Sequence, residues 1–379
     1  MRFDYYNHSI VDITGHTNLS NHKLKVYRYN YSQLQPFYKT KREVENDYET
    51  NQLRIAYATA RTLCSYHLDK KELYFDIIAS ILSHLNFVTK NSNNYLQIYE
   101  SRYKRLRDFS KTTRIGELAQ GINALFVQDR LNYPYVIDFH YFYEKVYGTP
   151  YGDRSTPDFV VLNEDFRKVG LFESKGEGAV SSTITGINGK LNDALTQLKV
   201  ITKPCAEELI PICARFEQNN DDKKNSSIHY SIITKACVKQ TPPLRILRMH
   251  YASWFYLIGD FTRANQLLED KEFDDLEKDV RYTPGTDDQK IDVYWVSSFL
   301  PLNLEDEKGQ TAFGISVRRL FYRSNFRIGI YKSVIKIIIN DNLSEDGIKY
   351  SKENTEEIHR FSDGTLIELR RKVNKENNI

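Results

Sequence analysis

The sequence of 379 residues contains few cysteines, and none of the four belongs to a CxxC pair. Without regular spacing they predict neither a zinc site nor a disulfide framework, so we expect buried, reduced thiols. The four are Cys64, Cys205, Cys213 and Cys237. An HExxH pair is also missing, and the nine histidines show no other metal-ligand spacing. The lack of a GxSxG motif argues against a serine hydrolase.

Long apolar runs and a strong net charge are absent as well. No stretch reaches the roughly 18 apolar residues that a membrane-spanning helix needs, and residues 1–20 lack the apolar centre of a signal peptide. We therefore expect a cytoplasmic protein without a membrane partner. With 53 Lys and Arg against 50 Asp and Glu, the net charge is only +3, so any affinity for nucleic acid must come from local patches.

The composition is that of a folded chain, with 40% hydrophobic and 27% charged residues. The length is sufficient for two or three domains with sizeable cores. A phosphate-binding loop is not among its motifs. The segment TGINGK, residues 185–190, ends in Gly-Lys as such a loop does, but the GxxxxGK spacing needs a glycine where Ile184 stands.

Hydrophobic periodicity predicts both helices and strands. In the middle of the chain their order is helix, three strands, helix, two strands, which predicts an α/β (α+β) fold with a central mixed sheet flanked by helices. NEDFRK at 163–168 and Asp363-Gly364 predict hairpin turns. Helices are expected over residues 53–87 (as a pair), 114–131, 191–202 and 244–268, and strands over 23–29, 135–143, 157–162, 169–174, 209–216, 228–238 and 328–339.

These elements divide the chain into three expected parts. Residues 1–108 form an N-terminal, mostly helical extension, and residues 109–243 form the core with the mixed sheet. Residues 244–379 form a C-terminal α+β extension. No internal repeat or long low-complexity segment argues for a solenoid or a linker array instead.

Two acidic residues and a lysine lie at the ends of two expected strands that are otherwise apolar. Asp158 begins one strand, while Glu173 and Lys175 stand two residues apart near the end of the next. Because side chains alternate along a strand, Glu173 and Lys175 share one face, and we expect all three to converge at one sheet edge. The alternative is a surface hairpin on which Glu173 and Lys175 form an exposed ion pair.

Neighbouring carboxylates repel each other and raise their own pKa values unless a cation lies between them. Mg²⁺ prefers oxygen ligands, commonly one or two carboxylates with waters and phosphate oxygens, and Asp158 and Glu173 can supply such ligands. A lysine beside the metal, as Lys175 would be, can orient the attacking water and offset charge that develops on the phosphate. The three residues therefore predict phosphodiester hydrolysis with Mg²⁺, or with Mn²⁺ in its place.

The same residues resemble the PD-(D/E)XK nucleases, also called the restriction-endonuclease-like superfamily. Pro157-Asp158 is similar to the PD of the motif, and Glu173-Ser174-Lys175 is similar to its ExK. The resemblance covers about residues 110–240 and implies a restriction-endonuclease-like core. It also implies that Asp158 and Glu173 bind the metal, helped by the backbone carbonyl of Ser174, and that Lys175 serves the water nucleophile.

Two flanking residues extend the resemblance. Members of the superfamily often carry a glutamate on the helix before the core sheet, and Glu117 in IGELAQG resembles it, which implies a part in metal binding and catalysis. Many also carry a glutamine on the helix after the ExK motif, and Gln197 in ALTQLKV resembles it, which implies a part in catalysis. The QxxxY pattern of one branch is not met, because Ile201 stands at the tyrosine position. That departure argues against membership of this branch.

A basic stretch directly precedes the expected core. Its cations can bind phosphates and its rings can stack on bases, so it predicts a nucleic-acid-binding segment, with a solvated helix face as the alternative. A second cluster, SVRRLFYRSNFR at 316–327, is a further candidate surface for nucleic acid or a partner, or else an amphipathic structural helix. The first stretch contains Arg102, Lys104, Arg105, Arg107, Lys111 and Arg114, interleaved with Tyr103 and Phe109.

Together these features predict a Mg²⁺-dependent endonuclease, with DNA as the expected substrate and RNA left open. Large extensions around such a core often confer recognition or assembly, so the resemblance implies a restriction or phage-defence role. Because double-strand cutting often needs two active sites, we expect a homodimer or a partner protein. Two alternatives stay open: a non-catalytic nucleic-acid-binding or scaffold protein that retains the fold, and a metal-dependent hydrolase of another phosphoester.

Overall fold

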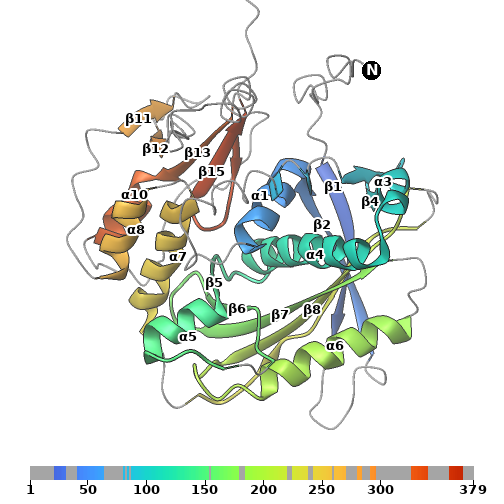
Figure 1. The fold of residues 1–379 in the computed structure, drawn as a ribbon, viewed down its shortest axis with the longest axis horizontal. Coiled ribbons are helices and arrows are strands. Elements are labelled where there is room, and N and C mark those ends of the chain that lie inside the picture. Colours follow the sequence, from blue (N-terminus) through green and yellow to red (C-terminus); the bar gives the residue numbers. More distant parts are fainter. Residues whose placement is uncertain are drawn as a thin grey trace, which may run out of the picture.

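A mixed β-sheet runs through the middle of the molecule, with helices on both faces (Figure 1). The computed structural model describes residues 21–30, 41–63, 80–81, 83–84, 87–152, 155–178, 184–219, 224–237, 242–257, 260–269, 280–283, 291–295, 326–339 and 358–369. Within these residues the sheet has eight strands, in the order β2-β1-β9-β8-β7-β6-β5 with β10 paired to β8. Their bounds are β1 Asn21–Tyr29, β2 Arg42–Asn51, β5 Tyr135–Asp138, β6 Phe159–Leu162, β7 Val169–Gly178, β8 Glu208–Phe216, β9 Ser227–Tyr230 and β10 Ile233–Thr234.

The strand directions make the sheet mixed. Strands β5, β6 and β7 form an antiparallel meander, and the hairpin predicted between β6 and β7 is confirmed. Strand β8 pairs parallel to β7, which requires a crossover, and helix α6 (Ile184–Lys199) provides it. Strand β9 returns antiparallel to β8, and β1 lies parallel to β9. The predicted α/β fold with a mixed central sheet is therefore confirmed.

Helix α4 (Asp108–Arg130) covers one face of the sheet, and helix α1 (Gln52–Leu63) packs against α4. Helix α6 covers the opposite face (Figure 1). The helices α1 and α4 approach closely at Gly121, where a Cβ atom would lie 2.1 Å from Oγ1 of Thr59. The residues predicted as the apolar face of α4 are all buried: Ile115, Leu118, Ile122, Leu125 and Phe126.

The strand predicted over residues 135–143 is correct only as far as Asp138. There β5 ends and helix α5 (Phe139–Tyr147) begins, so the prediction is wrong for the remainder. The Asp138 carboxylate accepts a hydrogen bond from the backbone N–H of Tyr141 at 2.7 Å, which caps the helix. Gly148 ends the helix with a left-handed φ of 73°. Local capping therefore overrides the alternating pattern.

The C-terminal part contains a second sheet, of five strands among the described residues, in the order β11-β12-β13-β15-β14. The strand predicted over 328–339 divides into β13 and helix α10, because Val334, Ile335 and Ile338 bury one face at helical spacing. The turn predicted at Asp363-Gly364 is confirmed between β14 and β15. The bounds are β11 Val280–Thr283, β12 Ile291–Trp295, β13 Phe326–Tyr331, α10 Lys332–Ile339, β14 Ile358–Arg360 and β15 Thr365–Leu369.

The single helix predicted over 244–268 is two helices, α7 (Pro243–Leu257) and α8 (Phe261–Leu268). Asp260 separates them, because its carboxylate accepts a hydrogen bond from the backbone N–H of Arg263 at 3.2 Å and caps α8. Across the described parts of the chain, no helix has the length and apolar character needed to cross a membrane. The remaining elements are β3 Val88–Lys90, β4 Leu96–Ile98 and α3 Glu100–Arg105.

Segments far apart in the sequence meet around Asp129, near the end of α4. Arg54 of α1 and Ser362 of the β14–β15 turn both donate to Oδ1 of its carboxylate, at 2.9 Å and 2.6 Å. The next residue of that turn, Asp363, is fully buried and pairs with Arg61 of α1. Strands β1 and β2 also belong to the central sheet. The N-terminal part is therefore joined to the core by strand pairing and by Arg54, and the C-terminal part by the contact of Ser362 with Asp129.

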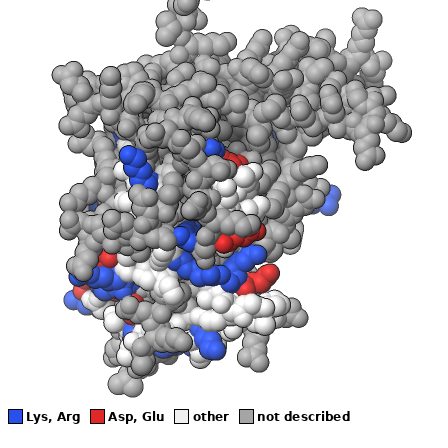
Figure 2. All heavy atoms as spheres, turned by 90° about the vertical axis from the view of Figure 1, so that its left-hand side faces the viewer, with Lys and Arg blue, Asp and Glu red and all other residues white. Residues whose placement is uncertain are grey.

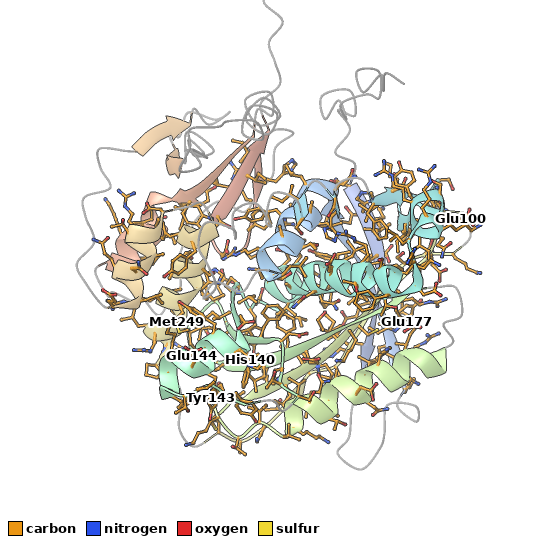
Figure 3. The ribbon with its side chains drawn as sticks, in the orientation of Figure 1. Glu100, His140, Tyr143, Glu144, Glu177 and Met249 are labelled. Carbon is orange, nitrogen blue, oxygen red and sulfur yellow. A yellow bond between two sulfur atoms is a disulfide. The ribbon has the colours of Figure 1, made fainter. Side chains whose placement is uncertain are left out.

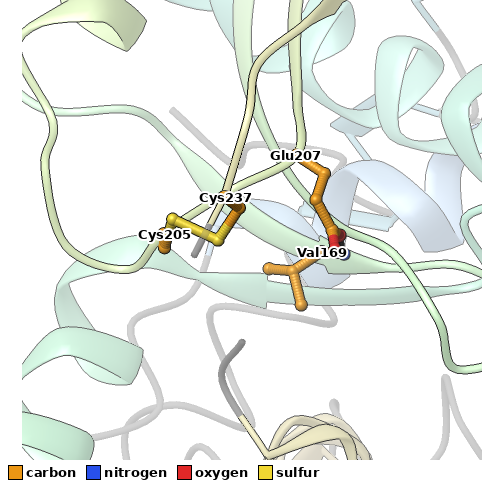
Figure 4. The surroundings of a disulfide bond; sticks show 4 residues. All are labelled: Val169, Cys205, Glu207 and Cys237. Atoms are coloured by element: carbon orange, nitrogen blue, oxygen red, sulfur yellow. Dashed lines mark hydrogen bonds between the residues drawn. A yellow bond between two sulfur atoms is a disulfide. The ribbon is translucent and has the colours of Figure 1, made fainter. Parts of the chain in front are cut away.

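A disulfide joins Cys205 and Cys237, whose Cα atoms are 5.6 Å apart (Figure 4). The expectation of reduced thiols is wrong for this pair. Strand β10 pairs antiparallel with β8, and the same register continued three residues beyond β10 sets Cys237 opposite Cys205. Cys213 is free and buried, as predicted, and Cys64 lies outside the described residues.

Candidate active site

Strand pairing brings Asp158 and Glu173 together. Phe159, the first residue of β6, pairs with Phe172 of β7, so Asp158 lies beside Glu173 on the neighbouring strand. The backbone N–H of Asp158 donates to Oε2 of Glu173 at 2.9 Å. In return, the backbone N–H of Ser174 donates to Oδ2 of Asp158 at 2.8 Å. The two carboxylates therefore occupy one place on the sheet, as their positions in the sequence predict.

Lys175 joins this pair from the same face of β7. Its ammonium donates to Oε1 of Glu173 at 2.5 Å and to Oε1 of Gln197 at 3.1 Å. Gln197 lies near the end of α6, which packs over this face of β7 and β8. The structure thus brings together four of the residues predicted as catalytic. They are Asp158, Glu173, Lys175 and Gln197.

Glu117, predicted as a further ligand and catalytic residue, has other partners. Its Oε2 lies 2.9 Å from the guanidinium of Arg114 and 3.4 Å from Nε2 of His84. Burial alone would raise the pKa of Glu117, but the hydrogen bond from His84 and the charge of Arg114 lower it overall. The face of α4 that packs on β7 carries Ile115 and Ala119 instead. The structure does not bring Glu117 to the carboxylate pair.

Asn123 of α4 contacts the motif where the prediction placed no residue. Its side-chain N–H₂ donates to Oγ of Ser174 at 2.8 Å and to the carbonyl oxygen of Lys175 at 3.3 Å. The side chain is fully buried and approaches β7 from the face opposite the carboxylates. A sequence signal existed, because Asn123 interrupts the apolar pattern between Ile122 and Phe126.

The carboxylate of Glu173 is buried, and Asp158 beside it is half-buried. Glu173 is only 3% exposed, so the alternative of an exposed cross-strand ion pair is wrong. Burial, and then the nearby Asp158 carboxylate, raise the pKa of Glu173 well above its usual range, although Lys175 acts in the opposite direction. Burial also raises the pKa of Asp158. Because both carboxyl groups are harder to ionise than usual, a further positive charge nearby would stabilise their ionised forms.

The donor set is oxygen only, which is the set that Mg²⁺ and Mn²⁺ prefer. Within the described ranges, no group of three or more Asp, Glu, His or Cys side chains is placed to hold a metal ion. Mg²⁺ commonly uses one or two carboxylates and completes its shell with waters and phosphate oxygens. Asp158, Glu173 and the backbone carbonyl of Ser174 fit that requirement.

An open groove of about 440 Å³ leads to Lys175. Its lining comes from three places: the second half of β7, one face of α6 with the residue that follows this helix, and the segment before Asp158. Lys175 lines the groove and also donates to Glu173, so it lies between the groove and that carboxylate. The lining residues are Ser155, Lys175, Lys190, Asp193, Thr196, Gln197 and Val200.

The predicted basic stretch forms α3 and the first turns of α4. A Cβ atom on Gly178 would lie 3.1 Å from Oη of Tyr103, so this stretch borders the far end of β7. In Figure 3, Glu100 of α3 and Glu177 of β7 lie toward the same end of the molecule. Half of the six cations already pair with acids one turn away: Lys104 with Glu100, Lys111 with Asp108, and Arg114 with Glu117.

The opposite end of the molecule carries α5, α7 and α8. On its described residues, Lys and Arg lie beside Asp and Glu and form no field of one sign (Figure 2). This mixture agrees with the small net charge of the chain. The side chains of the second predicted cluster, 316–327, lie outside the described residues.

Comparisons of the chain with protein-family models, with curated proteins and with solved structures give no match. The geometry of the site is therefore the basis for a functional assignment.

Proposed function

We propose that this chain is a divalent-metal-dependent nuclease that cleaves phosphodiester bonds of DNA. The observation that carries the proposal is the convergence of Asp158, Glu173 and Lys175 in one hydrogen-bonded group. The order of elements supports it. Helix α4, the meander β5-β6-β7, the crossover α6 and the parallel strand β8 follow the order that the resemblance to PD-(D/E)XK nucleases implies.

Asp158 and Glu173 would hold the metal ion, together with the backbone carbonyl of Ser174. Their raised pKa values support this role, because a buried carboxylate pair needs added positive charge to be fully ionised near neutral pH. A divalent ion bound here would supply Lewis-acid polarisation of the scissile phosphate.

Lys175 would act on the attacking water and on the phosphate. Its side chain is 21% exposed and lines the groove while it stays bound to Glu173. A fixed positive charge at this point offsets the negative charge that develops during phosphoryl transfer. Gln197 positions this ammonium through its 3.1 Å hydrogen bond.

A cleavage assay on plasmid DNA tests the proposal. We expect the wild type to produce nicked or shorter DNA in Mg²⁺ and none in excess EDTA. Asp158→Ala and Lys175→Ala should each lose activity by at least about 100-fold, since each removes a group that acts directly on the reacting centre. Glu177→Gln is the matched control, because Glu177 follows on the same face of β7 at the end of the strand (Figure 3) and should leave activity intact.

Equal products from the wild type and both alanine variants would refute this mechanism. Single-stranded DNA, RNA and mononucleotides, assayed side by side, separate the alternatives. Consumption of mononucleotides alone would point to another phosphoester hydrolase. Binding of nucleic acid without cleavage in Mg²⁺ or Mn²⁺ would favour the non-catalytic alternative.

A further inference from the structure

We propose that Lys190 binds a second phosphate of the substrate strand, about three nucleotides from the scissile one. The substrate is then a polynucleotide strand lying in the α6 groove, rather than a mononucleotide or a small phosphoester. This inference rests on the proposed function of the site, because it takes the groove next to Lys175 as the entry of the scissile phosphate.

The spacing along α6 places two functional groups on one line. Lys190 and Gln197 are seven residues apart, which is about two helical turns, so both face the groove. Seven residues advance about 10.5 Å along a helix, and a nucleic-acid strand advances about 3.4 Å per nucleotide along its axis. A strand whose scissile phosphate lies at Lys175, beside Gln197, therefore has a phosphate near Lys190 about three nucleotides away.

Lys190 is also free to take a ligand. In the described part of the chain it forms no ion pair, although Asp193 lies one turn further along the same helix and lines the same groove. By contrast, Lys104 and Lys111 pair with acids of their own helices. Asp193 is the one carboxylate among the described lining residues of the groove, so a phosphate that enters there meets in Lys190 an ammonium without an ion-pair partner.

The first test measures binding without cleavage. Fluorescence anisotropy of a fluorescein-labelled 12-nucleotide single strand in EDTA compares the wild type with Lys190→Gln, Lys190→Arg and Lys199→Gln. We expect Lys190→Gln to weaken binding about fivefold at low salt and to reduce the slope of log affinity against log salt by about 0.7, because one phosphate contact is lost. Lys190→Arg should restore most of the affinity. Lys199, exposed on α6 outside the groove, is the control and should change neither quantity.

The second test uses strand length. An unlabelled dinucleotide with one phosphodiester should compete almost equally well for the wild type and for Lys190→Gln. A competing octanucleotide should bind Lys190→Gln with about fivefold lower affinity than it binds the wild type. An equal loss at both lengths, or equal behaviour of Lys190→Gln and Lys199→Gln, would overturn the inference. The absence of any nucleic-acid binding would overturn it as well.

These outcomes are separable from those of the cleavage assay. If cleavage depends on metal and on Asp158 but Lys190→Gln changes neither the affinity nor its dependence on strand length, the proposed function stands and this inference is wrong. If Lys190 contributes to length-dependent binding but no metal supports cleavage, the phosphate contact stands and the proposed nuclease function is wrong.

Discussion

The buried amide of Asn123 donates a 2.8 Å hydrogen bond to Oγ of Ser174, on the face of β7 that is opposite the Asp158 and Glu173 carboxylates. The same amide group reaches the carbonyl oxygen of Lys175 at 3.3 Å. Helix α4 thus holds the backbone between Glu173 and Lys175 from behind. The position of the Ser174 carbonyl, the proposed metal ligand, therefore depends on the hydrogen bonds that Asn123 donates.

Removal of this contact should cost stability and activity together. We expect Asn123→Ala to lower the free energy of unfolding by about 1 to 3 kcal/mol, because buried polar partners are left without donors. Ser174→Ala should cost less, since it removes one partner and leaves the Lys175 carbonyl bonded. Urea denaturation of the two single variants and the double variant measures the coupling, which we expect to be at least about 0.5 kcal/mol. Strictly additive losses would contradict a direct bond.

Two glycines of α4 should respond oppositely to alanine. At Gly121 a Cβ atom would lie 2.1 Å from Oγ1 of Thr59 on α1, so Gly121→Ala should destabilise the fold by about 2 kcal/mol or more. At Gly116 the same atom meets nothing within 4 Å, so Gly116→Ala should stabilise the protein by up to about 1 kcal/mol through helix propensity. Thermal unfolding of both variants checks the pair, and a Gly121→Ala variant that is as stable as Gly116→Ala would contradict the close approach of α1 and α4.

Without metal, stability should fall as the pH rises from about 5 to about 8. Burial and the Asp158 carboxylate raise the pKa of Glu173 to about 8, so the folded chain keeps a proton that an ordinary glutamate, with a pKa near 4.3, has released when unfolded. The folded state therefore binds more protons across this window, and the free energy of unfolding decreases with pH, by on the order of 2 kcal/mol.

Urea titrations in EDTA at pH 5, 6.5 and 8 measure this slope. Glu173→Gln is the informative variant, because it is close in shape and cannot titrate. Its stability should change much less with pH over the same range. An unchanged slope in Glu173→Gln would assign the pH dependence to other groups and remove one support for the buried acid pair.

The parts of the fold that follow from local pattern could be predicted from the sequence. Two apolar runs of strand length on either side of the polar turn at 163–168 predicted the β6–β7 hairpin, and the apolar face of α4 is buried as expected. The predictions that were wrong involve competition between local signals or long-range pairing. The Asp138 cap converts the end of a predicted strand into α5, and the disulfide depends on the register between β8 and β10. Alternation does not show that the Asp138 cap starts a helix, and cysteine spacing does not show the register between β8 and β10.

The candidate site shows the same division. Asp158, Glu173 and Lys175 could be located because adjacent antiparallel strands place them within reach of each other. Asn123 on α4 could not be located in this way, because the rotation of the helix about its axis decides which side chain faces β7. That rotation turns Glu117 toward Arg114 and His84, and presents Asn123 to Ser174.

The most direct measurement is the position of a bound divalent ion. Crystals soaked in Mn²⁺ at pH 8 should show an anomalous difference peak between the carboxylates of Asp158 and Glu173, within coordination distance of the Ser174 carbonyl, and no such peak in Asp158→Ala. A peak elsewhere with this site vacant, or the same peak in Asp158→Ala, would contradict the assignment of these carboxylates as the metal ligands of a nuclease.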